Sequence, residues 1–299
     1  MKLILAFLSA LYFLTAAAFA GPLPKTWVPA TADWVTHLDV PAFAGSRISA
    51  LLQSKDAPPA IRTYLQKTRQ TLGIDLMRDI KHITLYGSAG DDRQGTAIIV
   101  GSFKPAPIIN HLQRNKSHLV LSVGTLSIHQ WIEPSQKQTL YLCFESPTRV
   151  IVATSSERIT GAIATIQGKQ PNLTAGARFP LPKTGAGDFI VGGGVQAAAP
   201  ISLLSKGQYF RFRAGESNEG LLNLTAHLDF PAAEDAADGE KILMGTLMAF
   251  VLTNSKDPQL ATLIRNLRIE AEGKTLTARF VCPSDEAYEL LCASLTKSK

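Results

Sequence analysis

The chain has 299 residues, of which 45% are hydrophobic and 18% are charged, so it can bury a large core and has about the length of two domains. Its formal net charge is +6, and the lysines and arginines are scattered along the sequence. Because nucleic-acid-binding surfaces usually need clustered basic residues, we expect no nucleic-acid partner.

Residues 1–20 have the pattern of a signal peptide. Lys2 provides a short positive region, a long apolar run follows, and Ala18-Phe19-Ala20 before Gly21 fits a small-x-small cleavage site. We expect cleavage after Ala20 and a periplasmic or secreted protein. The alternative is retention of this segment as an anchor, because about 18 apolar residues can just span a bilayer. We expect no membrane span in the mature chain, since no other run is long and apolar enough.

The three cysteines are Cys143, Cys282 and Cys292, and none has the spacing of a CxxC or metal-binding motif. Cys143 lies in an apolar, strand-like run, where we expect a buried thiol. Cys282 ends an expected strand and Cys292 lies about two turns into the next helix. That separation disfavours a disulfide between them but leaves the pairing open.

Apolar periodicity, proline and glycine predict a β-α-α-β-β-α unit in the first part of the mature chain. In its first strand, Trp34 and Leu38 share one face, and His37 and Asp39 share the other. The expected elements, in chain order, are a strand at 34–40, helices at 42–52 and 60–72, strands at 80–86 and 96–103, and a helix at 105–112.

A β-rich extension follows, and then a second unit. The extension is expected to contain strands at 118–123, 126–132, 140–144 and 150–153 and a helix at 158–166. The second unit is expected to contain strands at 189–195, 208–213 and 221–230, a helix after Pro231, a hairpin at 267–281 and a terminal helix capped by Ser284.

One motif occurs in both units. His37-Leu38-Asp39-Val40-Pro41-Ala42 returns as His227-Leu228-Asp229-Phe230-Pro231-Ala232, each time where a strand meets a helix. We therefore predict an α+β fold of two related β-α-α-β-β-α units, with mainly antiparallel sheets covered on one face by helices. The expected divisions are 21–167 for the first unit with its extension, 168–187 for a linker rich in Gly and Pro, and 188–299 for the second unit.

The repeated motif also supplies the candidate ligand-binding residues, which are His37, Asp39, His227 and Asp229. An imidazole and a carboxylate two positions apart on a strand lie about 7 Å from each other on one face. Two such pairs brought together could bind a metal or perform acid–base chemistry. The simpler interpretation is structural: each aspartate caps a helix, and each histidine is an ordinary residue of a polar strand face.

Other motifs give little support for catalysis. The sequence has no Gly-x-Ser-x-Gly and no His-Glu-x-x-His, and we expect no cofactor and no bound metal. Gly192-Gly193-Gly194 does not lead into a helix as a phosphate loop would, which favours a close approach between backbones. Phe210 and Phe212 are expected on one face of their strand, with the basic residues between them on the other.

The layout resembles an uncharacterised group of exported bacterial proteins that is frequent among planctomycetes and their relatives. The resemblance rests on the signal peptide, on residues Pro29 to Asp39, on the Gly-Ile-Asp-x-x-x-Asp-Ile segment from Gly73 to Ile80, and on a helix and hairpin near the end. It implies an envelope location and no established activity, and it assigns no catalytic residue.

These patterns predict an exported, non-catalytic envelope protein that binds or scaffolds an unknown envelope ligand or protein. The alternative is an exported hydrolase or metal-dependent enzyme that uses His37 with Asp39 and His227 with Asp229. A single pocket lined by all four side chains would favour the enzyme, whereas separated pairs would favour the binding protein.

Overall fold

The computed structural model describes residues 21–89, 95–134, 137–181, 183–196, 206–253 and 258–297. Its strands are β1 (Trp34–Asp39), β2 (Ile80–Gly87), β3 (Gly95–Gly101), β4 (Leu119–Val123), β5 (Leu126–Glu133), β6 (Gln138–Ser146), β7 (Arg149–Ala153), β8 (Asp188–Val195), β9 (Tyr209–Glu216), β10 (Leu221–Asp229), β11 (Leu267–Glu272) and β12 (Thr275–Pro283). Its helices are η1 (Lys25–Trp27), α2 (Val40–Ala44), α3 (Arg47–Gln53), α4 (Pro59–Leu72), α5 (Leu76–Asp79), α6 (Pro105–Gln113), α7 (Ser156–Ile166), α8 (Ala233–Thr253), α9 (Pro258–Asn266) and α10 (Ser284–Lys297). The signal peptide expected at 1–20 lies outside the described residues.

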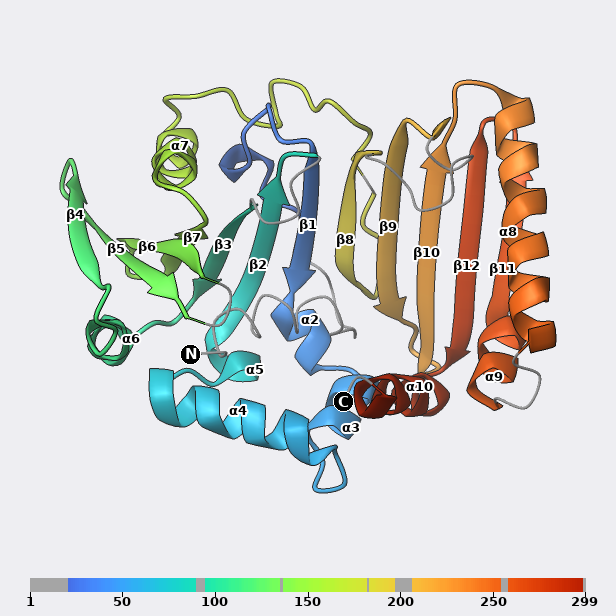
Figure 1. The fold of residues 1–299 in the computed structure, drawn as a ribbon, viewed down its shortest axis with the longest axis horizontal. Coiled ribbons are helices and arrows are strands. Elements are labelled where there is room, and N and C mark those ends of the chain that lie inside the picture. The colour runs from blue at the N-terminus through green and yellow to red at the C-terminus, as the bar shows by residue number, and fades with distance from the viewer. Residues whose placement is uncertain are drawn as a thin grey trace.

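The described strands form one antiparallel sheet in the order β11-β12-β10-β9-β8-β1-β2-β3-β7-β6-β5-β4 (Figure 1). The two halves of the chain meet where β1 pairs with β8, with Trp34 opposite Gly194 and Leu38 opposite Ile190. Both halves therefore belong to one continuous sheet. The α+β class and the antiparallel pairing agree with the sequence prediction.

Helices cover both faces of the first half of the sheet. Successive residues of a strand point to opposite faces. In β3, Ile99 belongs to a core cluster shared with α2, α3, α4, α6 and α10, whereas Ile98 belongs to a second cluster shared with α7. The one-face arrangement expected from the sequence is therefore not met in this half, because α7 packs against the face opposite α4 and α6.

The first helical run is interrupted. Residues 42–52 were expected as one helix, but α2 ends at Ala44, before Gly45, and α3 starts after Ser46. The hydroxyl of Ser46 accepts the backbone N–H of Ser49. This side-chain cap satisfies an N–H group at the start of the second helix. The short helix α5, which was not expected, starts in the same way at Asp75, whose carboxylate accepts the N–H of Met77.

The residues expected as a linker, 168–187, have no helix or strand where the structure describes them, but they are packed. Leu173 and Phe179 are buried in the cluster beneath α7, and Asn172 forms an isolated bridge with Pro29. The two halves also differ in strand order. The strand β1 pairs with β2, the first strand after its helices, whereas β10 pairs with β12, the second.

Candidate functional site

The first copy of the repeated motif lies at the end of β1. Asp39 Oδ1 accepts the backbone N–H of Ala42 at 2.8 Å and caps α2, whose first turn contains Pro41. Both His37 and Asp39 are almost fully buried, with 1% and 3% of their surfaces exposed. His37 was expected on an ordinary polar strand face. It is instead a core residue, because both faces of this half of the sheet are covered.

His37 contacts two residues of the neighbouring strand β2. Its Nδ1 lies 2.9 Å from Thr84 Oγ1, and its ring stacks on that of His82 with 5.6 Å between centroids. Burial, together with the neighbouring His82, lowers the pKa of His37 to about 4, against a smaller opposing effect of a hydrogen bond with the Gly21 backbone. The imidazole is therefore neutral at physiological pH.

The second copy lies at the end of β10 and is only partly buried. His227 Nδ1 lies 3.0 Å from Thr277 Oγ1 of β12, which repeats the contact between His37 and Thr84. Burial lowers the pKa of His227, and the nearby Arg211 lowers it further. The same imidazole–hydroxyl pair is thus built twice, on two different pairs of strands.

The two aspartates differ. Asp229 was expected to cap a helix like Asp39, but its carboxylate accepts hydrogen bonds from Arg211 of β9 at 3.0 and 3.3 Å and from Thr275 Oγ1 at 2.8 Å. Its carboxylate is therefore held by a guanidinium across the sheet. In the first copy, the residue opposite His37 on the neighbouring strand β8 is Val191, whereas the residue opposite His227 on β9 is Arg211.

The four candidate side chains do not form one site. The strands β8 and β9 lie between β1 and β10, so the two motifs are about 14 Å apart at the usual spacing of strands. Among the residues that the structure describes, no group of three or more His, Cys, Asp or Glu is placed to hold a metal ion. The geometry gives each histidine its own threonine partner, and it keeps the two His-Asp pairs apart.

The glycine run in β8 makes room for aromatic rings. A Cβ at Gly192 would overlap the ring of Phe212, and one at Gly194 would lie 2.8 Å from the ring of Phe210. The two rings stack with 6.4 Å between centroids and are half-buried. The triplet therefore serves a close approach between strands, as the sequence indicated, and the two rings share one face of β9.

The three cysteines are free thiols, so Cys282 and Cys292 do not form a disulfide. Cys143 and Cys282 are buried, and burial raises the pKa of each thiol to about 11, with smaller effects of Glu145 and Glu286. A thiol that stays protonated is a poor nucleophile. Neither of the two buried cysteines is suited to covalent chemistry.

An apolar cavity of ≈ 60 Å³ lies between the helices α4, α5 and α6 and the strands β3 and β7. Its lining includes Leu72, Ile108 and Val152, and its one hydroxyl, that of Thr68, donates to the Tyr64 carbonyl. The cavity therefore offers shape but no reactive group.

Several residues of the two motif environments were not found from the sequence. Thr84, His82 and Thr277 come from strands far along the chain, and an isolated Thr or His in an alternating strand gives no local signal. Gly21 was identified only as the residue after the cleavage site, yet its backbone contacts both Asp39 and His37.

Comparison with known proteins supports the fold alone. No family model matches the chain, and no curated protein matches it. Crystal form III of TP0453 aligns with a TM-score of 0.52 at 12% identity, over 91% of this chain and 99% of that chain. Crystal form I of TP0453 aligns with a TM-score of 0.49 at 12% identity, over 92% of this chain and 98% of that one.

Within the described residues, none of the helices combines the length and the apolar character needed to cross a bilayer.

Proposed function

We propose that this chain is an exported, non-catalytic envelope protein of the planctomycete-type group described above, built from two related units and active as a binding protein. The observation behind this proposal is an apolar surface on the second half of the sheet that no described helix covers fully. We call it the open apolar face and define it by Phe210, Phe212, Leu224, Ala226 and Phe280. Its occupant, we infer, is a molecule with an acyl chain.

The open apolar face runs across three strands. Leu224 lies opposite Phe280 of β12, and Ala226 lies opposite Phe212 of β9, so the five side chains share one side of the sheet. Leu224 is 39% exposed, and the three phenylalanines are only half-buried. Of the described elements, α10 lies at one end of these strands and α8 packs against β11 and β12, with no helix over β9 between them (Figure 1).

The helix α8, at the edge of the sheet, also has exposed apolar residues. Its first turns are acidic, but from Ile242 onward its sequence is apolar. Leu243 packs on the small cluster formed with β11 and β12, whereas Met248 and Leu252 are 54% and 78% exposed. Contiguous apolar surface of this kind marks a binding site in a soluble domain.

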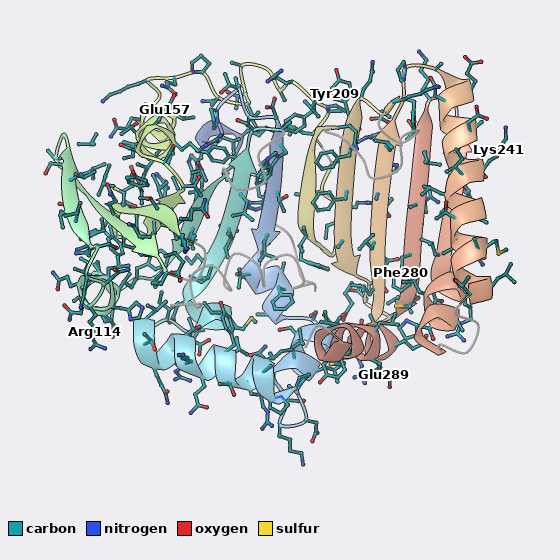
Figure 2. All side chains as sticks on the ribbon, in the orientation of Figure 1. Arg114, Glu157, Tyr209, Lys241, Phe280 and Glu289 are labelled. Carbon is teal, nitrogen blue, oxygen red and sulfur yellow. The ribbon has the colours of Figure 1, made fainter. Side chains whose placement is uncertain are left out.

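An acyl chain fits the chemistry of the face. The five defining residues have no charged or hydrogen-bonding side-chain group, so the surface gains energy only from apolar contact, at about 25 cal/mol for each Å² covered. Figure 2 shows Phe280 near the end of β12 that meets α10 and Tyr209 at the opposite end of the strands, where the next residue, Phe210, belongs to the open apolar face. The face thus offers an elongated surface along the strands, which suits an extended hydrocarbon.

The experiment is a titration of the mature protein with a fluorescent long-chain fatty acid. Leu224→Asp places a carboxylate on the open apolar face and should weaken binding at least about tenfold, because the charge must be desolvated. Asn223→Asp adds the same group to the next residue, on the opposite face of β10, and should leave binding unchanged. Absence of saturable binding by the unsubstituted protein, or equal loss in both variants, contradicts the proposal.

A further inference from the structure

The carboxylate of Asp39 is buried, and no described lysine or arginine side chain pairs with it. Its side chain is 4% exposed, and the single ion-pair partner within 4 Å among the described residues is His82, whose Nδ1 lies 3.9 Å from Oδ2. A histidine balances a carboxylate only when it is protonated. Buried charges in proteins are normally paired, because an isolated carboxylate is costly to remove from water.

The second copy of the motif shows what such a pairing looks like. Asp229 is bound by the guanidinium of Arg211, which belongs to the strand opposite His227. In the first copy the residue opposite His37 is Val191, so no guanidinium can come from that strand. Among the residues that the structure describes, the first copy keeps the carboxylate and has no guanidinium paired with it.

In the first copy the main-chain nitrogen of Gly21 contacts the carboxylate instead. It donates a hydrogen bond to Asp39 Oδ2, while Oδ1 is used by the backbone N–H of Ala42. Residue 21 must also be small, because a Cβ there would lie 2.7 Å from His82 Cε1 and 3.0 Å from Asp39 Oδ2. Gly21 is the residue that follows the predicted cleavage site.

We propose that Asp39 is the receptor for the free α-ammonium group of mature Gly21, so that cleavage after Ala20 completes a buried ion pair. This inference rests on the proposed export. A signal peptidase hydrolyses the Ala20–Gly21 amide with one water, which leaves a carboxylate on Ala20 and an amine on Gly21. The amine takes up a proton at neutral pH, because the pKa of an α-amino group is normally about 7.7–8.0.

The charge reaches the carboxylate that corresponds to Asp229, which Arg211 pairs with in the second copy. Before cleavage, Gly21 offers Asp39 a neutral amide N–H; after cleavage, it offers a cation. The groups that face it are Asp39 and His37 of β1 and His82 of β2. With His37 neutral, the new ammonium and Asp39 form the main charge pair, and the mature protein is more stable than a form with an extended amino terminus.

The test compares the protein that begins at Gly21 with a form that retains Ala20 in front of it. The extension should lower the equilibrium constant for folding at least about tenfold, because it replaces a buried ion pair with a neutral hydrogen bond. In Asp39→Asn the extension should have little effect. In the matched control Asp229→Asn, where the carboxylate pairs with Arg211, the extension should act as it does in the unsubstituted protein.

A direct titration covers the case in which Asp39→Asn does not fold. Nitrogen-15 labelling of Gly21 reports the pKa of its amine in the unsubstituted mature protein, and pairing should raise that pKa above 8. An ordinary α-amino pKa, or equal stability of the two amino termini, overturns the proposal. The amino-terminal sequence of the exported protein is read separately, so a different cleavage site counts against the predicted cleavage after Ala20 and not against the pairing measured in the Gly21 form.

Discussion

At the residue scale, His37 shows how burial in a sheet changes the pKa of a polar side chain. Its ring is buried between β1 and β2, and its pKa falls to about 4 from an ordinary value near 6.5. The folded protein therefore resists protonation that the unfolded chain accepts. Stability from this residue is fully present above pH 6.5 and is lost as the pH falls from 6.5 toward 4.

Between pH 7.5 and pH 4.5 this residue should cost the unsubstituted protein about 2–3 kcal/mol in free energy of unfolding. His37→Gln has no such titration, so its stability should fall less over the same range, as measured by urea unfolding at each pH. His227→Gln is the control. Because His227 is only partly buried, its removal should alter the loss of stability between the two pH values by less than the removal of His37 does. Equal losses in the unsubstituted protein and in His37→Gln would show that His37 is not held neutral.

The sequence predicted the shared face of His37 and Asp39, because alternation along a strand is a local property. It could not predict that this face is buried. That depends on contacts between distant segments, such as those of His82 and Thr84 of β2, more than 40 positions along the chain, with His37 and Asp39. The sequence also placed both aspartates at strand ends, but Arg211, which separates their roles, comes from a strand whose position in the sheet has no local signal.

At the element scale, Glu216 ties the two halves together at the ends of two helices. Its carboxylate accepts the backbone N–H groups of Arg47 at 2.9 Å and Ile48 at 3.4 Å, at the start of α3. It also accepts the hydroxyl of Ser284 at 2.7 Å, at the start of α10. The sequence predicted Ser284 as a helix cap, but here its hydroxyl donates to a carboxylate of β9.

Glu216→Ala should lower the free energy of unfolding by about 2–4 kcal/mol, because it leaves buried N–H groups and a buried hydroxyl without their charged acceptor. Glu219→Ala is the control, since Glu219 is exposed in the turn after β9 and should change stability by less than about 0.5 kcal/mol. Chemical denaturation of both variants measures the difference. Similar stabilities for the two variants would contradict the role assigned to Glu216.

At the scale of the whole molecule, the antiparallel class and most strands could be predicted from alternation and turn residues. The order of the strands could not, because it is set by contacts between distant segments. The pairing of β1 with β8 is an example: it joins residues more than 150 positions apart and makes one sheet from the two expected units.

The continuous sheet predicts cooperative unfolding. Separation of the halves would break the pairing of β1 with β8 and expose Phe189, which is 1% exposed in the intact sheet. We therefore expect a single thermal transition, with the same midpoint for tryptophan fluorescence, since all three tryptophans lie in the first half, and for loss of hydrogen-exchange protection in β10 with rising temperature, which reports the second. Two transitions with different midpoints would show that the halves are independent domains.

Export with cleavage after Ala20 is the claim that joins the proposed function to the pairing of Gly21 with Asp39. Its most direct test is the intact mass and amino-terminal sequence of the protein recovered from the periplasmic or secreted fraction of cells that express the full chain. The account predicts a single species that begins at Gly21. A protein that keeps residues 1–20, or that remains in the cytoplasm, would contradict it.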